Sequence, residues 1–231
     1  MYSKNYVLSK KQMLSSHIMG LYLKPEDGEH IPYTPGQFML LTLPCGVKRA
    51  YSIASAPNAE FLEFGIKLVE GEFTSRLPVT DEGEKILVEG PLGPLVYDTE
   101  GDYVLIAGGV GITPMMSVLR DRDGKECKKD VLFYSSRTKD GLIYFNELEK
   151  LEKRNQCLQV VFTLTRETPK DWKYETGHVD SKMIKKYVKD FDKKRYFVCG
   201  PAKMVDGLKK IILDELQIPN ANCTFEGWSI P

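Results

Sequence analysis

Histidine and cysteine, the side chains that most often hold transition metals, are scarce in this sequence of 231 residues. The three histidines and five cysteines are widely separated: His17, His30, His178, Cys45, Cys127, Cys157, Cys199 and Cys223. The cysteines are odd in number and never form Cys-x-x-Cys, so we expect neither zinc nor an iron–sulfur cluster in this chain. The same usage favours reduced thiols and therefore a cytoplasmic protein.

Net charge and long apolar runs are also lacking. Lys plus Arg and Asp plus Glu both number 32, so charge favours neither nucleic acid nor anionic lipid as a partner. No uninterrupted apolar run approaches the roughly 20 residues of a membrane span. The first fifteen residues carry three lysines and no apolar block, so we expect no secretory signal. With 42% hydrophobic residues, the chain has the composition of a globular protein with one large or two ordinary domains.

Up to about residue 98, short apolar runs alternate with turns rich in proline and glycine. The strand-like runs are Phe38–Thr42, Tyr51–Ala54, Phe61–Val69 and Lys85–Glu89. Turn signals such as Pro35-Gly36 and Gly90-Pro91 separate these runs. Evenly spaced strands with such turns predict an antiparallel barrel or sandwich.

After residue 100, strand-like and helix-like segments alternate, which predicts a parallel sheet with helices on both faces. The expected strands are Tyr103–Ala107, Val131–Ser135, Leu158–Leu164, Arg195–Cys199 and Cys223–Phe225. The expected helices are Pro114–Arg120, Glu147–Arg154, Lys182–Lys189 and Ala202–Leu216. A polar turn over Asp98–Asp102 separates the two patterns, so we expect domains at residues 1–98 and 99–231.

A glycine-rich segment, residues 107–114, follows the first strand of the second half. Its three glycines allow close backbone approach, with Thr113 as the expected N-cap and Pro114 as the first helical residue. Free amides and the helix dipole at this point suit a pyrophosphate. The segment is no Walker A motif, because no Lys-Ser/Thr follows, and Pro114 replaces the third glycine of G-x-G-x-x-G. A tight strand-to-helix turn without a ligand is the alternative.

Seven motifs are spread over more than 200 residues of the chain. They are Pro35-Gly36-Gln37-Phe38, Arg49-Ala50-Tyr51-Ser52, Gly71–Leu77, Gly90-Pro91-Leu92-Gly93, Gly108–Pro114, Cys199-Gly200-Pro201 and Glu226-Gly227-Trp228. In type and order they resemble the motifs of the ferredoxin–NADP reductase superfamily, including cytochrome b5 reductase-like and oxygenase-reductase members. The resemblance implies an N-terminal antiparallel Greek-key β-barrel that binds FAD and a C-terminal Rossmann-like α/β domain that binds NAD(P). It also implies hydride transfer between the two cofactors.

By this resemblance, the barrel carries the flavin site. Tyr51 offers a ring for the isoalloxazine, Arg49 a guanidinium for a phosphate, and Ser52 a hydroxyl near flavin N5. The alternative is an exposed strand whose tyrosine packs on a neighbour. The strand that includes Ile66 and Lys67 is expected to give backbone contacts to the flavin.

A short helix beside Gly71, with Thr74 and Ser75, is expected to bind a pyrophosphate. FAD contains a pyrophosphate and FMN does not, so this segment favours FAD. A plain hairpin turn at Gly71 is the alternative.

For the hydride site, the resemblance places Cys199 beside the nicotinamide, with Ser52 and Glu226 completing the expected catalytic set. A buried, inert cysteine is the alternative for Cys199. Trp228 either stacks on the flavin or serves as a hydrophobic anchor. In this half of the chain, the residues expected to bind a cofactor are Gly109, Gly111, Thr113, Pro114, Ser136, Arg137, Cys199, Gly200, Pro201, Met204 and Trp228. No metal is needed, because a reduced nicotinamide already carries the hydride.

The choice between NADPH and NADH stays open in the sequence. Arg137, with Ser136, is placed to reach a 2′-phosphate, which favours NADPH. The segment Phe162–Arg166 also resembles a phosphate site of plant-type relatives. Thr165-Arg166 followed by Trp172, Tyr174 and Gly177 equally resembles the NADH-using cytochrome b5 reductases.

The resemblance implies that electrons leave for a separate acceptor protein, ferredoxin-like or an oxygenase component. One alternative is an electron-transfer subunit of a larger complex, and another is a reductase of free flavin or quinone. A binding module that has lost its flavin is disfavoured by the intact Arg49, Tyr51 and Ser52.

Overall fold

The computed structural model describes residues 1–93, 101–125 and 129–228. The chain divides into two compact units, one with residues 1–97 and 113–122, the other with residues 98–112 and 123–231. The domain boundary expected after residue 98 lies outside the described residues. Of the two units, the first is the barrel unit and the second is the parallel-sheet unit.

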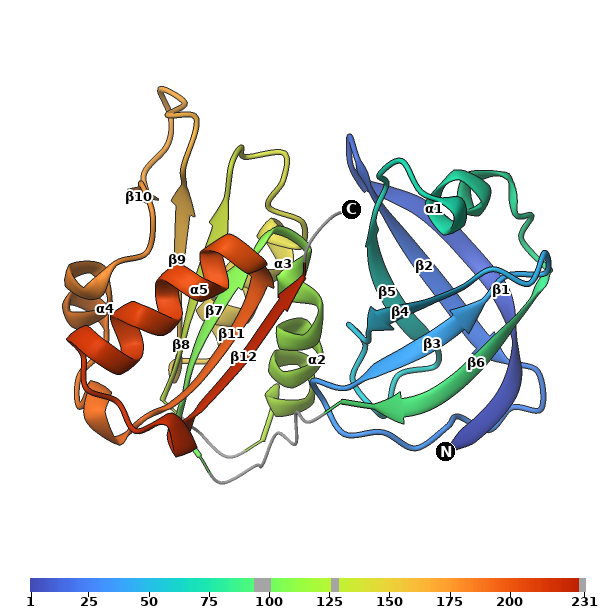
Figure 1. The fold of residues 1–231 in the computed structure, drawn as a ribbon, viewed down its shortest axis with the longest axis horizontal. Coiled ribbons are helices and arrows are strands. Elements are labelled where there is room, and N and C mark those ends of the chain that lie inside the picture. Colours follow the sequence, from blue (N-terminus) through green and yellow to red (C-terminus); the bar gives the residue numbers. More distant parts are fainter. Residues whose placement is uncertain (94–100, 126–128, 229–231) are drawn as a thin grey trace. The chain divides into compact units, whose positions relative to one another are not determined.

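The described part of the barrel unit forms a six-stranded antiparallel sheet in the order β4-β3-β6-β1-β2-β5 (Figure 1). The strands are β1 (Tyr2–Ser15), β2 (Ile18–Pro25), β3 (Phe38–Thr42), β4 (Lys48–Ser52), β5 (Leu62–Lys67) and β6 (Lys85–Leu92). A short helix, α1 (Glu72–Arg76), follows β5. Fully buried side chains fill the interior, among them Tyr6, Leu21, Leu23, Leu41, Phe64, Ile66 and Val88.

Backbone hydrogen bonds join the two edges of this sheet, β4 and β5. Just beyond β4, the amide of Ala54 donates to the carbonyl of Glu63 in β5 over 2.7 Å. The amide of Glu63 donates in turn to Oγ of Ser55 over 3.1 Å. We call the residues Ala54, Ser55 and Glu63 the barrel seam. This pairing satisfies edge groups that an open sheet would expose, and it closes the sheet into the expected barrel.

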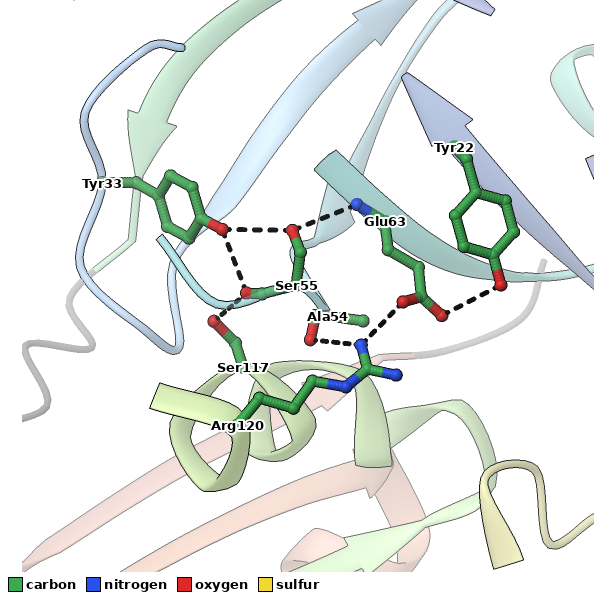
Figure 2. Close-up of polar contacts among 7 residues, drawn as sticks. All are labelled: Tyr22, Tyr33, Ala54, Ser55, Glu63, Ser117 and Arg120. Atoms are coloured by element: carbon green, nitrogen blue, oxygen red, sulfur yellow. Dashed lines mark hydrogen bonds and ion pairs between the residues drawn. The ribbon is translucent and has the colours of Figure 1, made fainter. Parts of the chain in front are cut away.

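Helix α2 (Ile112–Arg122) follows the glycine-rich segment, and its residues 113–122 pack in the barrel unit. Oγ of Ser117 donates to the carbonyl of Ser55 over 2.6 Å. Nη1 of Arg120 donates to the carbonyl of Ala54 over 2.9 Å and pairs with Oε2 of Glu63 at 2.6 Å (Figure 2). The helix is therefore fastened to the barrel seam.

The described part of the parallel-sheet unit forms a six-stranded parallel sheet in the order β10-β9-β8-β7-β11-β12. Its strands are β7 (Tyr103–Gly108), β8 (Asp130–Ser136), β9 (Leu158–Leu164), β10 (Glu175–Thr176), β11 (Arg195–Pro201) and β12 (Cys223–Trp228). The chain moves outward from β7 through β8 and β9, then crosses over to β11 beside β7. The strand order thus reverses between β7 and β11, and ligands of open parallel sheets bind at the carboxyl ends of strands at such a point.

Helices cover both faces of the parallel sheet (Figure 1). Helices α4 (Ser181–Tyr187) and α5 (Ala202–Lys210) share one core with the strands, which includes Val104, Ile106, Phe133, Val198, Ile184, Leu208 and Ile212. On the other face, Phe145 of α3 (Phe145–Arg154) packs on Phe162 with ring centroids 4.5 Å apart. Alternate strand residues point to opposite faces, so both faces are apolar and both need a helix layer.

The structure confirms the antiparallel barrel followed by an α/β parallel sheet, and it adds the long β1–β2 hairpin that the sequence pattern did not reveal. Register shifts between Leu8 and Lys10 and between Met13 and Ser15 interrupt the alternation that marks a strand. The helix expected over Ala202–Leu216 is α-helical to Lys210 and continues as a π-helical turn over Ile211–Glu215.

The cysteines of the described residues are not all free thiols. Cys45, Cys199 and Cys223 are free, whereas Cys157 is disulfide-bonded, so the expectation of reduced thiols throughout is wrong for Cys157. Cys127 lies outside the described residues. Among the described residues, we find no helix long and apolar enough for a membrane crossing and no cluster of three metal-ligating side chains.

Candidate functional site

In the barrel unit, a ring contact brings two of the expected flavin segments together. Tyr51, in β4, packs on Phe73 of α1 with ring centroids 5.1 Å apart and an interplanar angle of 52°. Burial raises the pKa of Tyr51 to about 12, against a smaller opposing effect of Arg49, so the phenol is protonated at neutral pH. This contact is of the kind expected in the alternative interpretation, in which Tyr51 packs on a neighbouring side chain. Stacking of Tyr51 on a flavin stays a prediction.

Arg49 and Ser52 lie on the same strand as Tyr51. Arg49 is exposed, and its Nη1 donates to the carbonyl of Lys48 over 2.7 Å. Ser52 ends the strand opposite Phe38 and is partly exposed. An exposed guanidinium and a partly exposed hydroxyl are both accessible to a ligand, as the flavin hypothesis requires.

The segment expected to bind a pyrophosphate is a helix that begins at Glu72, with Gly71 as its N-cap. The first helical hydrogen bond runs from the Ser75 amide to the Gly71 carbonyl, so the amides of residues 72–74 have no intrahelical acceptor. The hydroxyls point elsewhere: Thr74 donates to the Val69 carbonyl and Ser75 to the Gly71 carbonyl, both over 2.6 Å. The backbone amides, rather than the hydroxyls, are therefore the donors that this segment offers to a phosphate.

Neighbouring Ile66 and Lys67 end strand β5. Ile66 is fully buried in the barrel core, and Lys67 is half-buried. Since the Ile66 side chain is inside, only its backbone could meet a ligand, which is the kind of contact that the sequence predicted.

In the parallel-sheet unit, the loops after β7 and β11 touch at the point where strand order reverses. A Cβ on Gly108 would lie 2.5 Å from Sδ of Met204, and one on Gly200 would lie 2.6 Å from Cε of Met204. A Cβ on Gly111 would lie 2.1 Å from the carbonyl oxygen of Cys199. Gly111 is thus required where the two loops pack, because its neighbour is backbone, whereas Gly108 and Gly200 face the flexible end of the Met204 side chain. Gly109 differs, because its φ of +55° is left-handed and a Cβ there would meet nothing within 4 Å.

The start of α2 differs from the sequence expectation. Residues Gly109–Gly111 form a 3₁₀ turn, and α2 begins at Ile112 with Gly111 as its N-cap. Thr113 is therefore a buried residue inside the first turn, so its assignment as N-cap is wrong. Pro114 is the third helical residue rather than the first, where its missing N–H still costs no helical hydrogen bond.

Cys199 and Glu226 are direct neighbours on the parallel strands β11 and β12. Sγ of Cys199 donates to Oε2 of Glu226 over 3.7 Å. Burial, together with the adjacent carboxylate, raises the pKa of the Cys199 thiol well above its usual value. Burial also raises the pKa of Glu226, although the thiol hydrogen bond opposes this shift. A protonated thiol is a poor nucleophile, which agrees with the expectation that Cys199 forms no covalent bond with substrate.

Trp228, the last described residue, lies beside the glycine loop. It pairs with Pro201 in the parallel ladder, and its Cη2 atom would lie 2.9 Å from a Cβ on Gly111. This contact matches the hydrophobic-anchor interpretation of Trp228, and flavin stacking stays a prediction.

The loops after β8 and β9 carry the residues expected at a 2′-phosphate. The amide of Thr165 donates to the carbonyl of Ser136 over 2.9 Å, and the amide of Arg166 donates to the carbonyl of Arg137 over 3.1 Å. Both arginines are exposed, whereas Ser136 is buried. Two neighbouring cationic side chains at the carboxyl ends of parallel strands could hold a phosphate.

Sequence reasoning did not single out three polar residues at the barrel seam, Glu63, Ser117 and Arg120. Each of these residues bonds to a partner that is distant in the sequence, and Glu63 and Arg120 are 57 positions apart. No local motif therefore marks them. The one available signal was that Glu63, a charged residue, stands within the apolar run Phe61–Val69, where neighbouring side chains are expected to be buried.

Two protein families match the chain. The oxidoreductase FAD-binding domain matches residues 5–97, and the oxidoreductase NAD-binding domain matches residues 105–210. The chain belongs to the oxidoreductases that combine these two domains, and it has the two-domain fold of the ferredoxin reductase family. As a member, it combines an FAD-binding domain with an NAD-binding domain in the expected order.

Two curated relatives illustrate the range of proteins that contain such a chain. Flavohemoprotein A of Dictyostelium discoideum is 28% identical over 97% of this chain and 60% of its own length. The glycine betaine monooxygenase reductase subunit of Chromohalobacter salexigens is 31% identical over 78% of this chain and 52% of its own length. The chain therefore spans little more than half the length of these relatives.

Solved structures show the same fold. The FAD/NAD-binding domain of nitric oxide dioxygenase from Vibrio cholerae O1 biovar El Tor superposes with a TM-score of 0.87 at 21% identity, covering 97% of this chain and 98% of that chain. The ferredoxin NADP⁺ reductase of Neisseria gonorrhoeae, with bound FAD and NADP, superposes with a TM-score of 0.78 at 21% identity, covering 93% and 92%.

The glycine packing yields a first prediction. Gly111→Ala places a Cβ against the Cys199 carbonyl, so we expect a loss of about 1–3 kcal/mol of unfolding free energy. Gly207→Ala is the matched control, since Gly207 is exposed within α5 and a Cβ there would meet nothing within 4 Å. The control should gain roughly 0.5–1 kcal/mol. Urea unfolding followed by circular dichroism measures both, and equal effects would contradict the packing argument.

The raised pKa of Glu226 yields a second prediction. The folded chain holds the Glu226 proton more tightly than the unfolded chain, so this group lowers stability as pH rises from about 4.5 through its folded pKa. Glu226→Gln carries no such proton. The melting temperature of the variant relative to the parent should therefore rise between pH 4.5 and 8. A difference that stays constant across this range would show that Glu226 titrates normally.

Proposed function

We propose that this chain is an FAD-dependent NAD(P)H oxidoreductase that passes electrons to a separate acceptor. The observation that carries the proposal is the presence in one chain of an FAD-binding barrel and an NAD-binding parallel sheet. The residues fit the two cofactors. The α1 amides suit the FAD pyrophosphate, and the loop at the β7–β11 reversal point suits a dinucleotide.

A bound FAD supplies a ring that accepts a hydride and releases electrons singly. In the barrel unit, Tyr51 would support that ring, Arg49 would neutralise a phosphate, and Ser52 would offer its hydroxyl to the flavin. In the parallel-sheet unit, Gly109 leaves open space for the dinucleotide, and Pro201 and Met204 complete the loop wall. The protonated Cys199 thiol, hydrogen-bonded to Glu226, gives the nicotinamide an uncharged, dry neighbour. The chain's contribution is orientation and the exclusion of water.

The acceptor is proposed to be a separate redox protein, ferredoxin-like or an oxygenase component. A relative named as the reductase subunit of a monooxygenase supports this choice. The alternative, an electron-transfer subunit or segment of a larger assembly, is favoured by one observation: the flavohemoprotein relative continues well beyond the length that this chain spans. A reductase of free flavin or quinone is the remaining alternative. Domain limits at 98/99 and a cytoplasmic location stay predictions.

A visible spectrum of the purified protein tests the proposal. We expect bound FAD, seen as a yellow chromophore that NADPH or NADH bleaches under anaerobic conditions. Re-oxidation by added one-electron acceptor proteins, compared with free flavin and quinone, then separates the three acceptor classes. A colourless protein that cannot be reconstituted with FAD would remove the oxidoreductase proposal.

Arg137 yields a further prediction. Arg137→Ala removes one charged contact to a 2′-phosphate, so KM for NADPH should rise roughly tenfold while KM for NADH changes little. Steady-state kinetics with both nucleotides measures this difference. Arg154→Ala, at the end of α3, is the control and should affect neither. Equal changes for NADPH and NADH would remove Arg137 from the phosphate site.

A further inference from the structure

Helix α2 holds the barrel seam at two successive backbone carbonyls. Ser117 donates to the Ser55 carbonyl, and Arg120 donates to the Ala54 carbonyl (Figure 2). Ser117 is fully buried, and so are Ala54 and Ser55, the two seam residues whose carbonyls accept these hydrogen bonds. Buried carbonyls need hydrogen-bond donors, and α2 supplies one to each of these two carbonyls.

The Glu63 carboxylate fixes the Arg120 side chain at the seam. Its side chain is 4% exposed, and its Oε2 lies 2.6 Å from Nη1 of Arg120. The hydroxyl of Tyr22 donates to Oε1 over 3.3 Å. A carboxylate buried to this degree requires a cationic partner, so the ion pair holds Arg120 in one position.

Tyr33 also holds Ser55 of the seam. The hydroxyl of Tyr33 lies 3.0 Å from the Ser55 carbonyl and 3.1 Å from Oγ of Ser55. The Ser55 carbonyl therefore accepts from both Tyr33 and Ser117, as Figure 2 shows. The side chains of Tyr33, Ser117 and Arg120 thus restrain the backbone of residues 54 and 55.

The restrained carbonyls come two and three residues after Ser52, the end of strand β4. Movement of residues 54 and 55 would therefore move Ser52 and, with it, the expected hydrogen bond to flavin N5. Helix α2 also follows Gly111 directly in the chain, so the helix that holds the seam is covalently continuous with the glycine loop.

We propose that Arg120, with Ser117, is a positioning residue for hydride transfer: it locks the Ser52 end of β4 to the helix that starts at the glycine loop. The inference rests on the proposed function and assigns no cofactor contact to either residue. Its consequence is specific, because a loosened seam would slow the hydride step without weakening the binding of FAD or of the nicotinamide nucleotide.

The test compares Arg120→Met, Arg120→Lys and Ser117→Ala with the parent chain. Arg154→Met is the control, since it removes an arginine that pairs with Asp123 at the C-terminal end of α2 and makes no contact with the seam residues in the described hydrogen bonds. Stopped-flow reduction of the bound FAD by NADPH, over a range of NADPH concentrations, separates the limiting rate from the apparent Kd. FAD content and melting temperature are measured on the same samples.

We expect Arg120→Met to lower the limiting rate about ten- to a hundredfold, as a displaced reacting group does. FAD content and apparent Kd should stay within about twofold of the parent. Arg120→Lys should recover part of the rate, because it restores a charge to Glu63 but not the rigid guanidinium geometry. The control should be reduced at the parent rate.

A folded, FAD-bound Arg120→Met that is reduced at the parent rate would overturn the inference. If Arg120→Met does not fold, Ser117→Ala decides, because it removes one hydroxyl and leaves the ion pair intact. A lower limiting rate with unchanged apparent Kd supports the inference, and an unchanged rate overturns it. A parent chain that NADPH and NADH both fail to reduce contradicts the proposed function instead.

Discussion

The barrel seam is held to helix α2 through one buried charge, the Glu63 carboxylate. Glu63 joins the two sheet edges through its backbone, and its carboxylate lies beneath helix α2, where Arg120 neutralises it. Loss of one partner in a buried ion pair of this kind typically costs about 3–5 kcal/mol, because the other charge stays behind without compensation. The seam is thus a point of high energetic sensitivity, and it lies next to the strand that carries Arg49, Tyr51 and Ser52. Residues 49–55 therefore matter both for the stability of the fold and for the proposed flavin chemistry.

A second constraint governs the parallel-sheet unit. The loops that follow β7 and β11 approach so closely that Gly111 has no room for a Cβ beside the Cys199 carbonyl. The protonated Cys199 and its partner Glu226 lie on the adjacent strands β11 and β12, and the ring of Trp228 also faces Gly111. Among the four glycines of these loops, Gly109 alone combines a left-handed backbone with open space. Gly111 is therefore explained by packing within the protein, and Gly109 is left for direct approach of a ligand.

Both cofactor classes and both sheets could be predicted from the sequence, because the motifs are local and the strand periodicities differ between the two halves. The prediction failed where structure depends on distant partners or on irregular geometry. The β1–β2 hairpin was missed because bulges disrupt its alternation. Thr113 was placed at the N-cap because a 3₁₀ turn over Gly109–Gly111 cannot be recognised from residue types alone. Arg120 gave no signal, since its partners Ala54 and Glu63 are remote in the chain.

The central claim is that a hydride passes directly from C4 of the nicotinamide to a flavin held by this chain. The most direct measurement is the anaerobic rate of flavin bleaching with NADPH or NADH carrying deuterium at C4. Direct transfer predicts slower bleaching with the deuterated coenzyme than with the ordinary one. Identical rates at a step shown to be the chemical one, or the absence of any flavin to bleach, would contradict the account.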